Sequence, residues 1–454
     1  MLRGWDHGFG AGAGARAAPS ARTSPGCGRL SASRLSATVS VVAYPWLAST
    51  LTRNAAAIAL VPVALRLPWL VVSLPAEVLI DRVDRQRLII GVDVIRAGVT
   101  AGVAVGVATS TMSLPLLLVL LLVLGTGEVL ASNASLALLP SVVAPDALER
   151  ANGRLQASDV VANGVIGPPL AGVLIALALT TPFALDAASF AASAVLVATL
   201  RLRVAVPAPP VAAGGADSTP HRMRSDIAEG LRWLWAHPTL RLLALTLGVM
   251  NMLFSMATST EVLFARETLG LGSLGFGLLF TGGAVGGVLG SVVAAPLVAR
   301  IGVPRMLQLS LISESLSVLI YGLSPVAWVT GSAIALFAFT GIIWNVVTMS
   351  LRQRLIPDRL LGRVGSVYRL LGVGMAPLGA AAGGFIVVGA GHLVTRHLAL
   401  RAPMLVASVG YALLLLAVLP RMGRLARDQS SPGHGGPGAG DTPEPREALA
   451  APRA

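Results

Sequence analysis

The sequence is built from a succession of long apolar runs, each about the length of a membrane-spanning helix, with short polar connections between them. Apolar residues make up 54% of the chain and charged residues only 12%, and the mean hydropathy is +0.77. A soluble domain would carry about 25% charged residues. The runs are continuous rather than alternating, which argues against a transmembrane β-barrel. We therefore expect an all-α integral membrane protein, and at roughly 20 residues a span its length suits about twelve transmembrane helices.

The apolar runs fall on either side of a Pro/Ala/Gly-rich segment, residues 204–219, whose composition is typical of a linker. We expect an N-terminal six-helix bundle over residues 35–203, a cytoplasmic linker over 204–239 and a C-terminal six-helix bundle over 240–420. Residues 1–34 and 421–454 are Gly-rich and are expected to be disordered, the former alternatively being a misassigned start. The expected spans are Leu35–Leu51, Ala55–Leu79, Leu88–Thr109, Leu114–Leu138, Val160–Leu179, Pro182–Leu200, Leu240–Leu263, Leu274–Val298, Met306–Leu323, Val326–Met349, Val367–Val388 and Pro403–Leu419.

The end of the linker, Ser225–His237, has the pattern of an amphipathic helix. Ile227, Leu231, Leu234 and Trp235 recur at helical spacing, and the charged residues lie off that face. Because Trp is favoured at membrane interfaces, we interpret this segment as a helix lying on the cytoplasmic surface. The alternative is an ordinary solvated linker helix.

Every basic residue apart from His is Arg, so the chain lacks the Lys that a Walker A loop places on nucleotide phosphates. The connections on one side of the expected bundle are rich in Arg, and those on the other side are poor. By the positive-inside rule the rich side is cytoplasmic, which predicts that both termini are cytoplasmic. The net charge of +13 is thus explained without nucleic acid. The Arg-poor connections hold Arg53, Arg266, Arg396 and Arg401.

The connection between the second and third expected spans is short and strongly charged. It includes Asp81, Arg82 and Arg85 within the stretch Pro75–Arg87. This pattern resembles the loop joining the second and third helices of the major facilitator superfamily of transporters. Glu77 stands where that family usually has Gly, a departure that bears on helix packing there.

Two charged connections are similar in the two halves of the chain. Residues 145–154 and 357–363 both begin Pro-Asp, followed by Leu and then Gly-Arg. Chance similarity of loop chemistry is the alternative. The superfamily resemblance implies two six-helix halves in parallel repeat, with a substrate site between them near the middle of the membrane.

The fifth expected span contains Gly167-Pro168-Pro169-Leu170-Ala171-Gly172. It resembles the G-P-x-x-G-G motif of drug/proton antiporters, which is associated with export; generic Gly/Pro content of a membrane helix is the alternative. Residues 149–156, 66–69 and 353–364 are similar to the branch that contains enterobactin exporters and macrolide efflux proteins. The likeness extends from Tyr44 to Pro420.

The resemblance assigns a gate to the cytoplasmic ends of the two halves. It implies that Asp81 locks against the start of the eleventh span, near Arg363, because a helix N-terminus favours an anion. We expect Arg82 and Arg85 to pair with acids such as Asp146 or Glu149. Gly167 and Pro168 join this set as conformational residues.

Charged residues inside spans are costly and usually face a cavity or a partner. Proton coupling needs a carboxylate whose protonation responds to burial and to a neighbouring Arg. Glu128 is the first candidate and Glu314 the second, and Arg66 is also among the proton-coupling candidates. The alternative is a structural pair between Glu128 and Arg66. Asp93 and Arg96, one helical turn apart, are expected to be structural.

Nothing in the sequence favours an enzyme, a cofactor or a metal site. His392 and His397 are close, but no carboxylate or Cys accompanies them, so a solvated loop is the better interpretation. The lone Cys27 permits no internal disulfide.

The resemblance implies a monomeric multi-pass protein of the bacterial inner membrane, with the lipid bilayer, protons and a small molecule as partners. The function expected is proton-driven export of small hydrophobic or amphipathic molecules, such as drugs, macrolides or siderophores, by alternating access. An uptake porter or facilitator of the same fold is the alternative, and a non-transporting membrane sensor is another.

Overall fold

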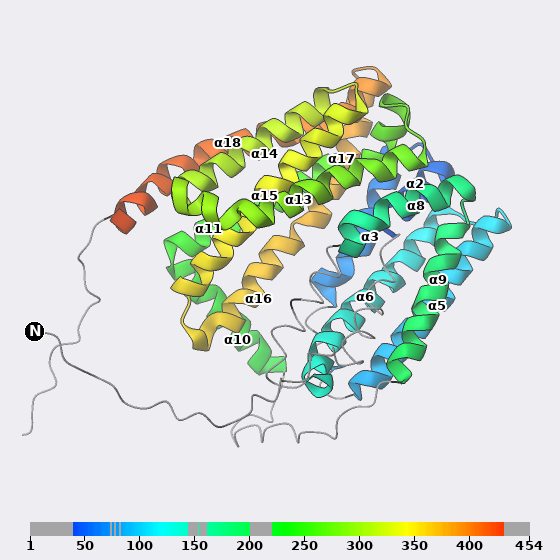
Figure 1. Ribbon diagram of the computed structural model, residues 1–454, viewed down its shortest axis with the longest axis horizontal. Coiled ribbons are helices and arrows are strands. Elements are labelled where there is room, and N and C mark those ends of the chain that lie inside the picture. The colour runs from blue at the N-terminus through cyan, green and yellow to red at the C-terminus, as the bar shows by residue number, and fades with distance from the viewer. Residues whose placement is uncertain are drawn as a thin grey trace, which may run out of the picture.

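The computed structural model describes residues 40–72, 75–76, 79–80, 83–143, 153, 161–199 and 220–430, which are helical apart from the connections between them. Figure 1 shows the helices in two groups, one from each half of the chain. The first group consists of α2 (Ser40–Leu51), α3 (Ala55–Val71), α5 (Arg85–Ala108), α6 (Leu114–Val142), the π-helical turn η3 (Val161–Ile166), α8 (Gly167–Leu177) and α9 (Thr181–Ala198).

The second group begins after α10 (Pro220–Ala236), which lies at the end of the expected linker. Its first helix, α11 (Pro238–Thr258), continues through α12 (Glu261–Leu263) into a second π-helical turn, η4 (Phe264–Thr268). The remaining helices are α13 (Ser273–Ile301), α14 (Val303–Leu323), α15 (Ala327–Leu355), α16 (Asp358–Gly374), α17 (Ala376–Gly391) and α18 (Arg396–Ser430).

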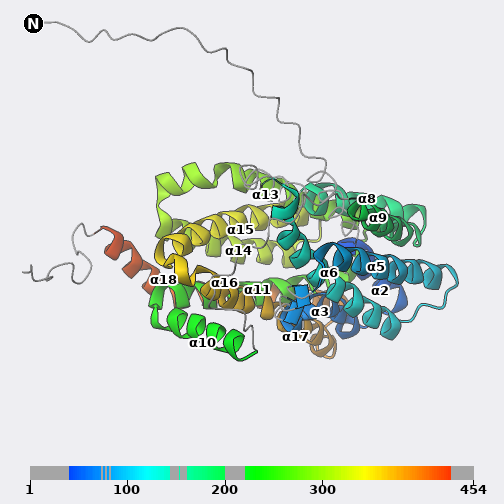
Figure 2. The ribbon, with the colours of Figure 1, turned by 90° about the horizontal axis from the view of Figure 1, so that it is seen from below.

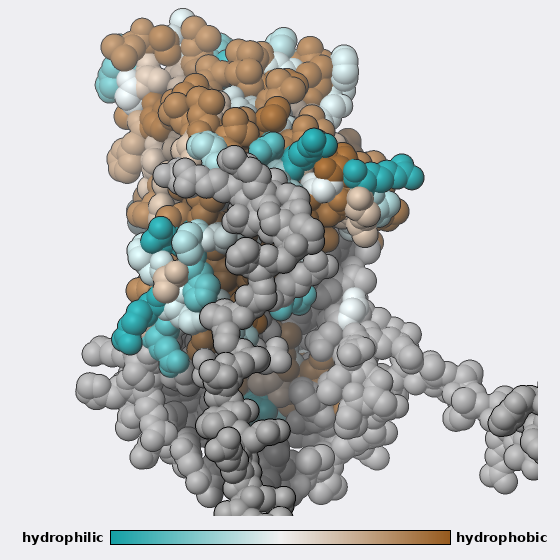
Figure 3. All heavy atoms as spheres, turned by 90° about the vertical axis from the view of Figure 1, so that its left-hand side faces the viewer, coloured by the Kyte–Doolittle hydropathy of each residue, from teal (hydrophilic) through white to brown (hydrophobic). Residues whose placement is uncertain are grey.

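Within the described ranges, nine helices are long and apolar enough to cross a membrane. Two shorter apolar helices, Ala55–Val71 and Gly164–Leu177, lie where the second and fifth spans were expected, and α2 is described from Ser40. The chain is therefore an all-α integral membrane protein, while the total of twelve spans stays a prediction. Figure 3 shows hydrophobic side chains covering the upper part of one face. Large apolar side chains such as Trp328, at 75% exposure, and Phe385, at 67%, are suited to contact lipid.

Local sequence explains where several helices begin. The side chain of Asn54 accepts hydrogen bonds from the backbone N–H groups of Ala56 and Ala57 and so caps α3. Asp84 caps α5 in the same way. Between α13 and α14 the chain turns at a single residue, Gly302, whose φ of +86° lies in the region that favours Gly.

Small residues bring helix backbones together inside the second half. A Cβ at Gly290 of α13 would lie 2.6 Å from the carbonyl oxygen of Phe339 on α15, and Gly282 and Gly286 approach α15 as closely. These glycines recur every four residues and form one face of α13. Such a face lets two membrane helices pack through direct backbone contact.

The two halves meet along two helix pairs, α3 with α17 and α8 with α13. Figure 2 shows both pairs side by side. A Cβ at Gly384 of α17 would lie 2.9 Å from the Cα of Ala56 on α3, so this contact also depends on a small residue. The halves are thus packed directly on one another through α3, α8, α13 and α17.

One segment differs from the sequence-based expectation. Helix α18 continues through Pro420 to Ser430, although residues after 420 were expected to be a disordered tail.

Helix α10 covers nearly all of the expected amphipathic segment. Leu234 is buried where α10 packs on α16 and α11, while Leu231 and Trp235 are 41% and 45% exposed. The placement of α10 on the cytoplasmic membrane surface stays a prediction.

Candidate functional site

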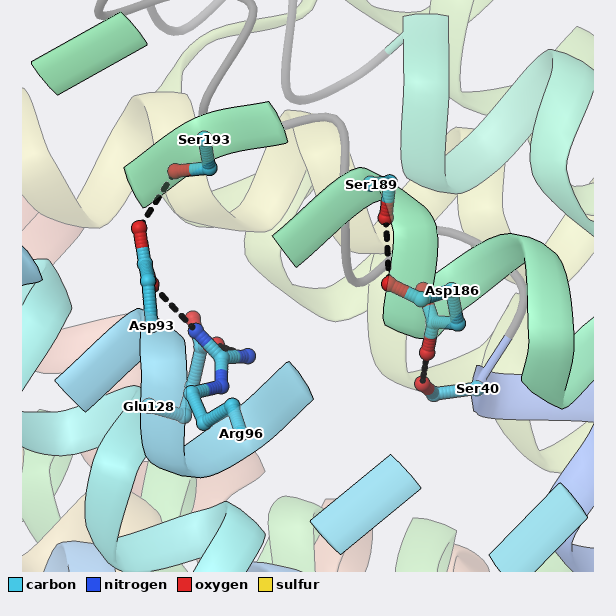
Figure 4. Close-up of polar contacts among 7 residues, drawn as sticks. All are labelled: Ser40, Asp93, Arg96, Glu128, Asp186, Ser189 and Ser193. Carbon is cyan, nitrogen blue, oxygen red and sulfur yellow. Dashed lines mark hydrogen bonds and ion pairs between the residues drawn. The ribbon is translucent and has the colours of Figure 1, made fainter. Parts of the chain in front are cut away.

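A cluster of charged residues lies inside the first half, between α5, α6 and α9 (Figure 4). Arg96 of α5 is at its centre. Its Nη2 donates to Oε2 of Glu128 on α6 at 2.5 Å, and its Nη1 lies 3.8 Å from Oδ1 of Asp93 one turn earlier. The guanidinium also lies 4.0 Å from the ring centroid of Phe190 on α9, which adds a cation–π contact. One cation thus holds two carboxylates inside a membrane-spanning bundle.

The members of this cluster differ in how far the protein encloses them. The side chains of Asp93 and Arg96 are only 3% and 8% exposed, whereas that of Glu128 is 40% exposed. Asp93 also accepts a hydrogen bond from the hydroxyl of Ser193 on α9. Buried charges are stable only when they are paired and hydrogen-bonded, and Asp93 meets both conditions. Glu128 is the member least enclosed by protein.

Another buried acid, Asp186 of α9, connects the start of α2 to the same bundle. Asp186 accepts a hydrogen bond at 3.0 Å from the side chain of Ser40, the first described residue of α2 (Figure 4). Asp186 was not among the residues expected from the sequence, although an acid inside an apolar run is an available signal.

The alternative interpretation, a structural pair between Glu128 and Arg66, is wrong, because the partner of Glu128 is Arg96. Arg66 lies on α3 and donates instead to the hydroxyl of Ser255 on α11, at 3.2 Å, across the two halves. Asp93 and Arg96, expected to be separate structural residues, belong to the same cluster as Glu128. A coupling role for Glu128 remains a prediction.

The expected gate lies mostly outside the described residues, which do not include Asp81, Arg82, Asp146 or Glu149. Arg85 begins α5 and donates from Nη1 to the carbonyl oxygen of Ala137 near the end of α6, at 3.0 Å. Arg363 falls within α16, and its side chain is outside the described part. The gate therefore stays a prediction.

The Gly-Pro motif lies at the contact between the halves. Gly167 and Pro168 begin α8 and are buried. The carbonyl oxygen of Pro168 lies against Gly277 of α13, and the hydroxyl of Ser273 donates to the carbonyl oxygen of Gly172 at 3.0 Å. A Cβ at Gly172 would lie 2.7 Å from the carbonyl oxygen of Ser273. The motif thus permits direct backbone contact between α8 and the opposite half.

Two arginines connect the halves at the end where α2 ends and α3, α13 and α18 begin, hereafter the joined end. Arg266 of η4 donates to the hydroxyl and carbonyl oxygens of Ser49 on α2, at 2.6 and 2.8 Å. Arg396 pairs with Glu267 at 2.9 Å and donates to the carbonyl oxygen of Arg53 at 2.7 Å. These arginines were expected in Arg-poor connections, but their bridging of the two halves was not predicted from the sequence.

A partly open cavity of about 960 Å³ lies between α11, α12, α13, α14 and α15 of the second half, with Gly164 of η3 contributing from the first half. Glu261 and Tyr321 line it, and the carboxylate of Glu314 lies next to the lining residue Gly341. Glu314, the second coupling candidate, is only 1% exposed. Glu261 was overlooked because it fell near the end of the expected span.

In the part of the chain that the structure describes, no group of three potential metal ligands is found.

A fold of two helical bundles joined through glycine-rich contacts, with charges inside the bundles, defines a transporter of the major facilitator type. The sequence profile of the family described as transmembrane secretion effector matches residues 30–437. The chain belongs to this family.

Curated relatives and solved structures agree with this assignment. The chain is 26% identical over 310 residues to the enterobactin exporter EntS of Citrobacter koseri, an alignment covering 67% of this chain and 68% of the relative. It is 26% identical over 295 residues to EntS of Escherichia coli O1:K1, covering 64% of each chain. The chain thus spans about two thirds of the length of these relatives.

Solved structures of transporters share the fold. A bacterial homologue of the human lysosomal transporter Spinster, in an inward-facing and unoccupied conformation, superposes with a TM-score of 0.67 at 15% identity, covering 90% of this chain and 98% of that one. The nucleoside transporter NupG superposes with a TM-score of 0.64 at 12% identity, covering 88% of this chain and 98% of that one. At these identities the likeness concerns the fold alone.

Proposed function

We propose that the protein is a secondary active exporter of small hydrophobic or amphipathic molecules, in the drug, macrolide or siderophore class. Export proceeds by alternating access and is driven by proton entry. The family description and the exporter relatives support the direction. The Gly-Pro motif, which contacts α13, also supports export, because it resembles a motif found in antiporters.

The observation that carries this proposal is the bridging of the two halves at the joined end by Arg266 and Arg396. Alternating access requires two bodies that are held together at one end at a time. A few exposed polar bonds contribute little each, so they can close an end without locking it. The Arg-poor composition of the connections at this end supports its placement on the outer side of the membrane.

The Asp93–Arg96–Glu128 cluster supports the coupling step. When Glu128 takes up a proton it loses its charge, and the ionic attraction between Glu128 and Arg96 is lost. Arg96 then faces Asp93 alone, across 3.8 Å. A change of charge inside a bundle alters the relative free energies of two conformations, which is how a proton can drive transport. Glu314 is the second coupling candidate.

Direction and driving force can be tested with everted membrane vesicles from a strain expressing the full chain. We expect energised vesicles to accumulate one or more of ethidium, erythromycin and a catecholate siderophore, and a protonophore to abolish the accumulation. Vesicles from the same strain carrying an empty vector are the control. Accumulation in right-side-out vesicles instead would identify an uptake porter. Absence of any substrate-dependent proton flux in liposomes, across the same panel, would favour a non-transporting membrane sensor.

A further inference from the structure

The cavity in the second half has walls that are mainly apolar and aromatic. Phe254 of α11 and Phe337 of α15 stack with their ring centroids 5.0 Å apart and an interplanar angle of 16°. Phe280 of α13 and Tyr321 of α14 also line the cavity. The faces of aromatic rings carry negative partial charge and attract cations.

Acidic groups lie in the same walls. Glu261 lines the cavity at 7% exposure, and the hydroxyl of Tyr321 faces its carboxylate. Glu314 lies on the same helix as Tyr321, and a Cβ at Gly341 would be 3.9 Å from its Oε1. Because Gly341 has no side chain, the carboxylate of Glu314 lies next to the cavity.

Oε2 of Glu314 and Oγ of Ser317 lack a hydrogen-bond partner within the described structure. Both belong to α14, and they lie one helical turn apart. Buried polar groups in proteins are nearly always hydrogen-bonded, so an unpaired carboxylate oxygen beside a cavity indicates a missing partner. A ligand that donates hydrogen bonds or carries positive charge supplies that partner.

None of the residues that line the cavity in the described structure is Arg, Lys or His. Arg66 does not line the cavity. It donates a hydrogen bond to Ser255, which follows the lining residue Phe254 in the sequence. A hard metal ion is poorly suited to the site, because such ions take about six or more oxygen ligands and the walls are mostly aromatic and aliphatic. The combination of ring faces and carboxylates is suited to an organic cation.

We propose that this cavity binds a hydrophobic organic cation, with the charge between Glu261 and Glu314 and the apolar groups against Phe254, Phe280 and Phe337. The role of this site rests on the proposed export function, because the bound organic cation would be the substrate that the exporter carries. Gly164 of η3 brings the first half into the wall, so a bound cation lies in contact with both moving bodies. An anionic molecule is disfavoured in the same place.

The test measures binding without transport. The purified full chain in detergent is dialysed against radiolabelled tetraphenylphosphonium, with protein-free micelles correcting for partition. Tetraphenylborate, of nearly the same shape and opposite charge, is the matched control ligand. We expect saturable binding of the cation, weakened about tenfold or more when both Glu261→Gln and Glu314→Gln are present. Glu229→Gln, the same substitution on α10, is expected to leave binding unchanged.

A second readout applies to the wild-type chain and does not depend on how the variants fold. A hydrophobic carbodiimide is expected to modify Glu261 or Glu314, as located by mass spectrometry, and tetraphenylphosphonium is expected to protect that residue. Equal cation affinity in the wild type and a correctly folded double variant overturns the proposal. So does a labelled residue that the cation fails to protect, or saturable binding of tetraphenylborate that Arg66→Gln abolishes. Failure of export in vesicles with cation binding intact would instead contradict the export function and leave the site standing.

Discussion

The guanidinium of Arg96 on α5 is bonded to the carboxylate of Glu128 on α6, with Nη2 2.5 Å from Oε2. The two side chains face each other across a helix contact, and Asp93 and Ser193 extend the network to α9. At the buried end Asp93 is paired with Arg96 and hydrogen-bonded by Ser193, while Glu128 is the member least enclosed by protein. A pair built in this way combines a structural anchor with a group that can exchange a proton.

The first prediction concerns stability. Removing Arg96 leaves Asp93 as a buried charge without its cation, and breaking a buried pair by deleting one partner costs about 3–5 kcal/mol. We expect Arg96→Met to lower the free energy of unfolding by about 3 kcal/mol. Glu128→Gln is expected to cost less, because Glu128 is partly exposed and Arg96 keeps Asp93 as a partner. Chemical unfolding in detergent measures both, and equal costs would show that the network is not organised around Arg96.

The second prediction concerns coupling. We expect Glu128→Gln to fold normally and to remove the dependence of export on external pH, because the residue can no longer gain or lose a proton. Glu128→Asp is expected to retain part of that dependence. Transport rates across a pH series in everted vesicles provide the measurement, with Glu229→Gln as the control. An unchanged pH profile in Glu128→Gln would remove this residue from the coupling step and leave Glu314 as the next candidate.

The third prediction concerns the contact between the halves. A Cβ added at Gly172 would lie 2.7 Å from the carbonyl oxygen of Ser273, which belongs to the opposite half. We expect Gly172→Ala to force α8 and α13 apart and to reduce transport, at a cost of about 1–3 kcal/mol typical of overpacking. Gly98→Ala is the control, since nothing lies within 4 Å of the added Cβ. Wild-type transport and thermal stability in Gly172→Ala would mean that this close contact is not needed.

The fourth prediction concerns the joined end. Arg266→Gln removes the charged hydrogen bonds to Ser49 and the cation–π contact with Trp46, whose ring centroid is 4.9 Å from the guanidinium carbon. Partly exposed contacts of this kind contribute about 0.5–1 kcal/mol, so the population with this end open should rise about two- to fivefold. The measurement is the maleimide reaction rate of a cysteine introduced at Thr52, in a Cys27→Ser background. An unchanged rate would show that Arg266 does not hold this end closed.

The sequence was a good predictor of where helices lie and a poor predictor of which residues meet. Lipid requires continuous apolar helices, so the expected span Pro182–Leu200 corresponds closely to α9. The sequence offered Arg66 as an alternative partner of Glu128 and missed Arg96, because hydropathy does not report how each helix is rotated about its axis. Arg66 and Arg96 were both charges inside spans, and only packing decides which one faces α6. Glu261 was missed because the helix continues past the expected end through η4 to Thr268.

The last prediction concerns orientation, on which the assignment of the gate and of the proton path depends. The Arg-rich connections predict that Asp81 and Arg363 lie on the cytoplasmic side and that Thr395, just before α18, lies outside. Single cysteines at these positions, in a Cys27→Ser background, are treated with a membrane-impermeant maleimide. We expect Thr395→Cys to react in intact spheroplasts, and Asp81→Cys and Arg363→Cys to react only in everted vesicles. Labelling of Asp81→Cys and Arg363→Cys from opposite sides would mean that the spans have been miscounted. The pseudo-symmetric pairing of the halves, and with it the proposed alternating access, would then be wrong.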